Sequence, residues 1–340
     1  MRLGGFRLWR WLNRDSIAIL ALHGVIGEEV VGRWSPLRRP YSANKLERGL
    51  RALQRWYRFI PMRDAVEMIE GRRPVEAYSM VLTFDDGYLN QFRYALPVLR
   101  KLGIPASFYI ATGLIDRREP YWFDRLDYVL QKANVSSKSV RVGDRSVTFD
   151  GGDRASVGRS FRRLREYAKN LPKDDDMLAI LDTFAESLEA ESGERLRDVF
   201  EGDDWSGLPH WDELRDVSRD PLVELGSHTA SHARLAHVSA PKAREELAVS
   251  RQRLEQEIGR PCVEFCYPSG SYDAAVASLV REAGYRCAVT SDAGLNRPGA
   301  DLFKLKRVHF PEFEDDAGLF TAVSGFNVFL SRLRARLRGS

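Results

Sequence analysis

Residues 80–87 read Met-Val-Leu-Thr-Phe-Asp-Asp-Gly, a short apolar run that ends in two adjacent carboxylates and a glycine. The run Met80–Phe84 predicts a buried β-strand, because a short apolar stretch bounded by a turn signal fits a strand covered on both faces. Apolar residues then recur at helical spacing through residues 88–102, and Gly103 is a typical helix end. A second apolar run follows at 106–111. This stretch therefore predicts a strand–helix–strand unit with parallel strands.

The same alternation continues in the second half of the chain, and an apolar run at 17–22 opens it. We expect strands at 222–225, 263–267, 286–290 and 305–308, and helices at 240–258 and 274–283. Buried strands separated by helices indicate an α/β protein with a mostly parallel sheet or barrel.

Residues 116–209 interrupt this rhythm with a charged, mostly helical segment that contains a candidate hairpin at 140–149. No linker divides the chain, so residues 1–340 are interpreted as one domain with 116–209 inserted in it. Two roles stay open for the insertion. A solvated unit packed on the domain is favoured, and a lid that narrows substrate access is the alternative.

The small positive charge of the chain, +4 from 52 basic and 48 acidic residues, lies at its ends. Residues 1–14 and 326–340 each hold four arginines and no acidic residue, so the remainder carries about −4. Nucleic-acid binders carry basic charge as a patch on the folded domain, so we expect no nucleic-acid partner.

An apolar stripe at helical spacing predicts a basic amphipathic helix over residues 319–340. Its members are Leu319, Val323, Phe326, Phe329 or Leu330, Leu333 and Leu337. Together with the N-terminal tail, such a helix suits peripheral contact with an anionic membrane surface. The alternative, slightly favoured, is that both tails pack on the barrel with their arginines in water.

The chain has three cysteines, Cys262, Cys266 and Cys287. This odd number fits no disulfide framework and suits a reducing compartment. The apolar run at 17–22 is shorter than the core of a signal peptide, and no run reaches the ~18 residues of a membrane span. We therefore expect a cytoplasmic protein. If its basic tails contact an anionic membrane, the protein would associate with the inner face of that membrane.

Two groups of candidate metal ligands follow predicted strands. Asp85 and Asp86 are adjacent carboxylates, which repel each other unless a cation lies between them, although Asp-Gly is also a common turn. His228 and His232 are spaced i, i+4, which would place both rings on one face of a helical turn, within reach of one metal. Two histidines and one carboxylate form a facial set that leaves positions open for water and substrate.

A third segment, residues 265–273, runs from a strand into a Pro-Ser-Gly turn. A sharp turn exposes backbone N–H groups, which can stabilise an oxyanion, but Pro-x-Gly turns are frequent and this signal is weak by itself.

Together these residues resemble the polysaccharide deacetylases, carbohydrate esterase family 4. The family's Thr-Phe-Asp-Asp-Gly motif stands at 83–87 and its His-Ser/Thr-x-x-His motif at 228–232. The resemblance covers roughly 200 residues outside the insertion and the tails. It implies a distorted (β/α) barrel of about seven parallel strands and hydrolysis of N-acetyl groups on amino sugars. It also implies one divalent metal, zinc first, with nickel, cobalt and iron as alternatives.

Carried over by position, the resemblance implies that Asp86, His228 and His232 bind the metal. Asp85 would be the general base that takes a proton from the metal-bound water. The backbone N–H of Ser269, which replaces a tyrosine common in the family, would help to bind the oxyanion.

The chain departs from the family in its third motif, where Cys266 stands in place of an arginine that orients the base. It resembles an exopolysaccharide-type subgroup in which late motifs are permuted. That likeness assigns the general acid to His23, at the end of the first strand, and places Arg307 near the base. His309 is kept as an alternative acid.

The leading function hypothesis is therefore a metal-dependent hydrolase that removes N-acetyl groups from an amino-sugar glycan or its biosynthetic precursor. One alternative is a non-catalytic carbohydrate-binding relic of the same fold. Retention of Asp85, Asp86, His228 and His232 together with a candidate acid argues against it. Another alternative is a deacylase of a lipid-linked sugar.

Overall fold

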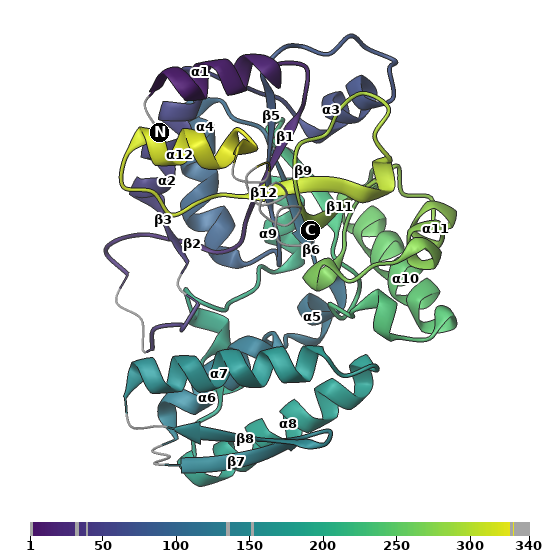
Figure 1. Cartoon of the computed structure of the whole chain (residues 1–340). Coiled ribbons are helices and arrows are strands. Elements are labelled where there is room, and N and C mark those ends of the chain that lie inside the picture. The colour runs from purple at the N-terminus through teal and green to yellow at the C-terminus, as the bar shows by residue number, and fades with distance from the viewer. Residues whose placement is uncertain are drawn as a thin grey trace, which may run out of the picture.

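Seven parallel strands close into a barrel in the computed structural model, which describes residues 3–30, 34–38, 40–133, 137–150, 153–326 and 329. In order around the ring, the strands are β1 (Ala18–Leu22), β12 (Leu305–His309), β11 (Cys287–Ala293), β10 (Glu264–Cys266), β9 (Val223–Ser227), β6 (Ala106–Ile110) and β5 (Ser79–Phe84). β5 pairs with β1 and closes the ring, and the short strand β4 (Arg58–Phe59) pairs with β5 from outside. The predicted α/β barrel is therefore confirmed (Figure 1).

The barrel is distorted where β11 and β12 pair. Their register shifts between Val289 and Ala293, so the two strands do not run as one regular ladder. A short outer pair, β2 (Val25–Ile26) with β3 (Tyr41–Ser42), lies in the segment after β1.

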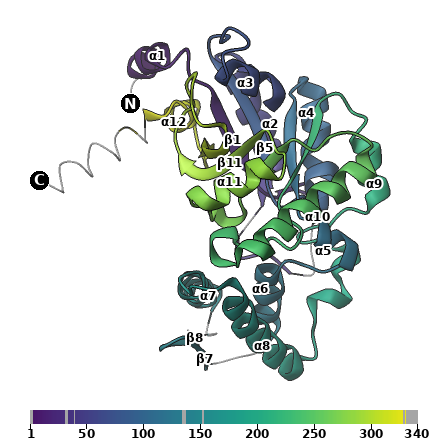
Figure 2. The ribbon, with the colours of Figure 1, turned by 90° about the vertical axis from the view of Figure 1, so that its right-hand side faces the viewer.

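Helices surround the strands, as Figures 1 and 2 show. They are α2 (Ala43–Gln54), α3 (Met62–Ile69), α4 (Leu96–Leu102), α5 (Thr112–Arg117), α9 (Trp211–Val217), α10 (Ala240–Ile258), α11 (Ala274–Glu282) and α12 (Asp316–Val323). Single turns of 3₁₀-helix occur at η2 (Leu196–Asp198), η3 (Phe200–Gly202), η4 (Leu235–His237), η5 (Pro268–Gly270) and η6 (Leu302–Lys304). The helix expected over 88–102 instead begins with a π-helical turn, η1 (Gln91–Ala95), which runs into α4.

Alternation along the strands divides the core into two layers. Ile19, Val81 and Leu305 belong to one cluster of buried residues, and their chain neighbours Leu20 and Leu82 belong to the other. The first cluster fills the inside of the barrel and the second packs against the helices, because successive side chains of a strand point to opposite faces. This alternation decides which residues at the strand ends point into the barrel.

The insertion lies apart from the helices that surround the barrel and forms the lower layer in Figures 1 and 2. It contains α6 (Trp122–Lys132), the hairpin β7 (Ser137–Val142) and β8 (Arg145–Asp150), α7 (Arg154–Lys169) and α8 (Asp174–Ser192). The predicted hairpin is confirmed. A buried ion pair of 2.6 Å between Arg234 and Asp174 joins the loop after β9 to the start of α8. The insertion is therefore fastened to the barrel at a loop that carries candidate site residues.

The N-terminal helix α1 (Leu3–Leu12) packs beside the end of α12. Trp9 Nε1 donates to Ser324 O at 2.9 Å, and the Trp9 ring contacts Phe326 and Phe329. Of the expected C-terminal helix, the structure describes α12 and residues up to 326 and 329, while Leu330, Leu333 and Leu337 lie outside the described residues. Among the helices described, none has the length and apolar character needed to cross a membrane.

Candidate active site

Asp85 continues the inward-facing series of β5, two residues after Thr83 and four after Val81. Arg307 on β12, which only β1 separates from β5 in the ring, donates from Nη1 and Nη2 to the two carboxylate oxygens at 2.6 and 2.7 Å. Arg307 is itself fixed by Thr290 O at 2.7 Å and Thr83 Oγ1 at 3.2 Å. Burial alone would raise the pKa of Asp85, but the Arg307 guanidinium lowers it well below its usual range. Asp85 is therefore ionised and held in one orientation.

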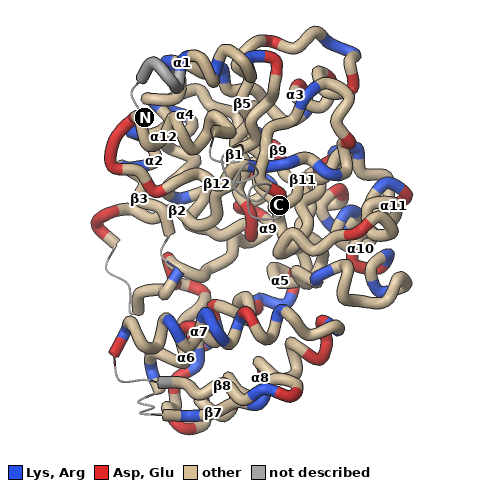
Figure 3. The backbone as a smooth tube through the Cα atoms, in the orientation of Figure 1, with Lys and Arg blue, Asp and Glu red and all other residues tan. Residues whose placement is uncertain are grey.

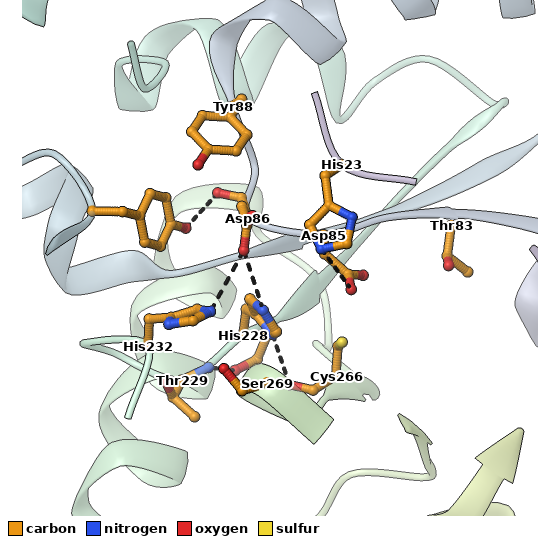
Figure 4. Close-up of polar contacts among 12 residues, drawn as sticks. His23, Thr83, Asp85, Asp86, Tyr88, His228, Thr229, His232, Cys266 and Ser269 are labelled. Atoms are coloured by element: carbon orange, nitrogen blue, oxygen red, sulfur yellow. Dashed lines mark hydrogen bonds and ion pairs between the residues drawn. The ribbon is translucent and has the colours of Figure 1, made fainter. Parts of the chain in front are cut away.

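Asp86 points to the other side of the turn, toward two histidines (Figure 4). Its Oδ1 lies 3.6 Å from His228 Nε2 and 3.5 Å from His232 Nε2. Asp86 has φ of 72°, a left-handed conformation that is strained for a residue with a side chain. Tyr121 donates to the Asp86 carbonyl at 2.5 Å and helps to hold this turn.

The two histidines come from an irregular loop after β9, so the expected helical turn is wrong. Thr229 and His232 both have positive φ, at 63° and 61°, which no α-helix contains. Glu246 of α10 fixes the loop by accepting from Ala230 N at 3.0 Å and Ser231 N at 2.8 Å. The loop nevertheless brings the two rings together, with centroids 4.9 Å apart.

Asp86, His228 and His232 fit a divalent metal. Their candidate ligand atoms lie within 4.8 Å of one another, and the side chains are buried or nearly so. His228 Nδ1 lies 2.8 Å from the Cys266 carbonyl, which accepts its proton and leaves Nε2 free as a ligand atom. Burial raises the pKa of Asp86, but its bonds to His228 and His232 lower it well below the usual value, so the carboxylate is charged.

A second cluster, Asp85 with His228 and Cys266, also brings three ligand types together. It does not suit a cation, because both oxygens of Asp85 and the Cys266 sulfur already face the Arg307 guanidinium. His228 Nδ1 is likewise engaged by the Cys266 carbonyl. The first cluster is therefore the candidate metal site.

His23 follows β1 and its ring lies beside the Asp85 carboxylate (Figure 4), with its Nε2 3.9 Å from Asp85 Oδ2. The side chain is about one-third exposed, at 34%. Burial lowers the pKa of His23 to about 4, although Asp86 and Asp85 act in the opposite direction. His309 stacks on it with ring centroids 6.4 Å apart. Of the two histidines, His23 is the nearer to the site.

Ser269 lies in the η5 turn with φ of 54°. The neighbouring amides are used inside the turn, since Gly270 N donates to Tyr267 O and Ser271 N to Pro268 O. Within the described parts of the chain, no acceptor is hydrogen-bonded to the N–H of Ser269. This amide is free to donate to a bound molecule.

Six of the seven predicted site residues line one cavity of about 140 Å³, and the seventh, Arg307, lies behind Asp85. Strained backbone concentrates here as well. Of the six residues other than glycine that have positive φ in the described chain, four belong to this site: Asp86, Thr229, His232 and Ser269. Such strain persists where surrounding structure enforces it, which is typical of functional sites.

A larger cavity of about 590 Å³ adjoins the site through His232 and is lined by Trp122 and by residues of α8. The small cavity suits an acetamido-sized group rather than a whole ligand, since ordinary ligand pockets have about 300–1,000 Å³. The larger one has room for a sugar chain beside it.

Several residues of the site escaped prediction from the sequence. Gln91 Nε2 in the π-helical turn donates to Asp85 O at 2.5 Å and His23 O at 3.2 Å, which ties two strand ends together. Arg38, Arg165 and Lys169 also line the cavity. Nothing in the sequence marks Gln91 or the three cations, because the π-helical turn and the placement of the cations are visible only in the structure.

A family model described as polysaccharide deacetylase matches residues 72–139 and 184–288, which together span just over half of the chain. No curated protein sequence matches the chain.

Solved structures share the fold at low sequence identity. The Streptococcus pyogenes deacetylase PplD in complex with acetate has 14% identity and a TM-score of 0.58, with 91% of this chain and 98% of that chain covered. IcaB from Ammonifex degensii has 19% identity and a TM-score of 0.55, with coverages of 92% and 96%. A de-N-acetylase from Aggregatibacter actinomycetemcomitans has 15% identity and a TM-score of 0.54, with coverages of 90% and 100%.

Proposed function

The chain belongs to the polysaccharide deacetylase family, enzymes that act on N-acetyl amides of sugars, and from this premise we propose how its site works. The substrate is an N-acetylated amino-sugar glycan or its biosynthetic precursor, as in an exopolysaccharide pathway. The observation that carries the proposal is the Asp86–His228–His232 cluster beside an ionised Asp85, in a cavity of acetamido size.

Asp86, His228 and His232 hold one divalent cation, most simply zinc, since a carboxylate with two imidazoles suits that ion. Nickel, cobalt and iron accept the same ligands. Bound there, the ion supplies Lewis-acid polarisation of the acetyl carbonyl and lowers the pKa of water.

Asp85 accepts the proton of the attacking water. The two Arg307 hydrogen bonds keep its carboxylate ionised and in one orientation at the wall of the cavity. A carboxylate with so low a pKa holds a proton only briefly, which favours passing it on. The Ser269 N–H donates a hydrogen bond to the acetyl oxygen, which becomes negatively charged when water adds to the acetyl carbon.

His23 donates a proton to the leaving nitrogen, because an amide anion is too poor a leaving group to depart unprotonated. Its lowered pKa keeps His23 neutral at pH 7 in the free protein, so it must gain a proton during turnover. Asp85 Oδ2, 3.9 Å from His23 Nε2, is the neighbouring source. The proton removed from water thus reaches the amine through Asp85 and His23.

Two other functions compete with this one. A non-catalytic carbohydrate-binding protein of the same fold would need neither an ionised base nor a strained metal loop. A deacylase of a lipid-linked sugar would use the same machinery on another substrate. The test is acetate release across neutral glycans, nucleotide sugars and lipid-linked sugars, with each metal added in turn. If no substrate released acetate, the result would favour the non-catalytic binding protein. If only lipid-linked sugars released acetate, the result would favour the deacylase of a lipid-linked sugar.

We also propose that the protein acts in the cytoplasm and contacts the inner face of the membrane through its tails. Leu8, Trp11 and Leu12 lie at helical spacing on α1 and are 60%, 52% and 53% exposed. Trp9 of the same helix instead packs on the C-terminal segment. Exposed apolar residues beside basic ones suit the interface of an anionic bilayer. The three free, buried cysteines agree with a reducing compartment.

A further inference from the structure

Three cations that do not belong to the barrel strands reach into the active-site cavity. Arg38 comes from the segment between β2 and β3, and Arg165 and Lys169 come from the insertion helix α7. The two residues of α7 are spaced i, i+4 and therefore share one face of the helix. Figure 3 shows α7 as a basic helix in the layer below the barrel.

The two cations of α7 lack carboxylate partners. Lys169 Nζ donates to Ser269 Oγ at 3.1 Å, and the Arg165 guanidinium lies over the rings of Phe123 and Phe161 at 5.8 and 5.4 Å. Arg165 Nε is buried and has no hydrogen-bond partner. Across the described residues, neither side chain forms an ion pair. A buried donor left without an acceptor is unfavourable, so an acceptor group beside the Arg165 guanidinium would be stabilising.

The carboxylates of the cavity are already engaged. Asp85 is held by Arg307, and Asp86 is shared by two histidines and by Arg38, whose Nη2 lies 3.3 Å from it. Asp124, behind Arg38, accepts from Tyr88 at 2.6 Å, and burial raises its pKa to about 7. The positive charge of α7 is therefore not neutralised by the protein.

The cations also repel one another. Burial lowers the pKa of Lys169 to about 8, and the positive charges of Arg165 and Arg38 make smaller contributions in the same direction. Burial and then Arg38 lower the pKa of Arg165 as well. A bound divalent cation would add further positive charge to the same cavity. An anion that entered between these groups would relieve the repulsion and accept from the unpaired donors.

We propose that Arg38, Arg165 and Lys169 bind an anionic group, a phosphate or a carboxylate, that the substrate carries close to its N-acetyl group. This inference rests on the proposed deacetylase function and narrows its substrate to an acidic amino sugar. Arginine pairs bidentately with both phosphate and carboxylate, whereas lysine acts as a point charge. The insertion thereby sets the preference of the enzyme for an acidic substrate, and it does more than pack on the barrel as a solvated unit.

The test compares acetate release from three tetrasaccharides of N-acetylglucosamine: one neutral, one with a phosphate ester and one with a carboxylate. We expect kcat/KM to be higher for at least one charged form, and the form preferred distinguishes phosphate from carboxylate. In Arg165→Gln and Lys169→Gln, the ratio of charged to neutral kcat/KM should fall at least about tenfold, the usual size of a lost charge-assisted hydrogen bond. Arg163→Gln is the matched control, because Arg163 is an exposed residue of the same helix.

Binding gives a second readout. Inorganic phosphate should inhibit turnover of the neutral tetrasaccharide, with an inhibition constant raised at least about tenfold in Arg165→Gln and unchanged in Arg163→Gln. An unchanged substrate ratio in both Arg165→Gln and Lys169→Gln would overturn the anion site while the deacetylase function stood. Absence of acetate release from all three tetrasaccharides would instead contradict the deacetylase function itself.

Discussion

Replacing Arg307 by methionine should move the acid limb of the pH–rate profile to higher pH. Arg307 donates two hydrogen bonds to Asp85, at 2.6 and 2.7 Å, and both side chains are almost fully buried. In the variant, burial remains and continues to raise the pKa of Asp85, while the guanidinium that lowers it is gone. Asp85 must be ionised to accept a proton, so activity would be lost at a higher pH as the solution is acidified.

The size of the shift follows from the bonds lost. A hydrogen bond to a charged group contributes about 1.5–3 kcal/mol, and one pKa unit corresponds to about 1.4 kcal/mol. Arg307 donates two such bonds, worth about 3–6 kcal/mol together, so the acid limb should rise by about two to four pH units. Breaking a buried ion pair also destabilises a protein by about 3–5 kcal/mol, so thermal unfolding is measured alongside. In the native protein this stabilisation is present where Asp85 is ionised, and it is lost as pH falls through the depressed pKa.

The assay is kcat/KM for acetate release between about pH 4 and 9. Arg307→Lys keeps a positive charge without the two-pronged geometry, and should give a smaller shift than methionine. Arg297→Met, at an exposed position, is the control. An acid limb that stays in place in Arg307→Met, in protein that still binds metal, would refute the assignment of Asp85 as the base held by Arg307.

Three other outcomes follow from the site and the tails. His228→Ala should lose stoichiometric metal, measured by elemental analysis after gel filtration, because only two protein ligands remain; full retention would show that the ligand set is wrong. His23→Ala should keep its metal and lose at least about a hundredfold in kcat, and near-normal turnover would transfer the acid role to His309 or to Asp85 alone. The intact protein should float with anionic vesicles at low salt, and Trp11→Ser with Leu12→Ser should weaken flotation; absence of any flotation by the intact protein would end the membrane proposal.

Strand periodicity made much of the barrel and its site predictable. An apolar run followed by Asp85 and Asp86 predicts both the strand and the residue at which it ends. Because side chains alternate along β5, Asp85 falls on the inner face with Thr83, while the turn carries Asp86 toward the histidines. The local sequence pattern was therefore sufficient to predict that these residues lie at the site.

The histidine loop shows where such patterns fail. An i, i+4 spacing suggested a helical turn, yet Thr229 and His232 adopt positive φ. Glu246, some 15 residues further along the chain, holds the loop by accepting from two of its amides. This tertiary contact decides the backbone, and spacing alone does not contain it.

The cations of the cavity were unpredictable for a related reason. Arg165 and Lys169 look like ordinary members of a charged helix, and only the docking of the insertion brings Lys169 to Ser269 of the barrel. Arg234 and Asp174, buried and paired at 2.6 Å, are part of that docking. A contact between segments about 60 residues apart leaves no periodic trace in the sequence.

Acetate release by the metal-loaded protein and by its Asp85→Asn variant shows whether this chain is a deacetylase that uses Asp85 as its base. Asparagine keeps the shape of Asp85 but cannot accept the proton, so the comparison isolates the base. We expect acetate from at least one N-acetylated oligosaccharide and a loss of about 10²–10⁴-fold in the variant, with metal content unchanged. Equal rates for the two proteins, or no acetate from any N-acetylated sugar, would contradict it.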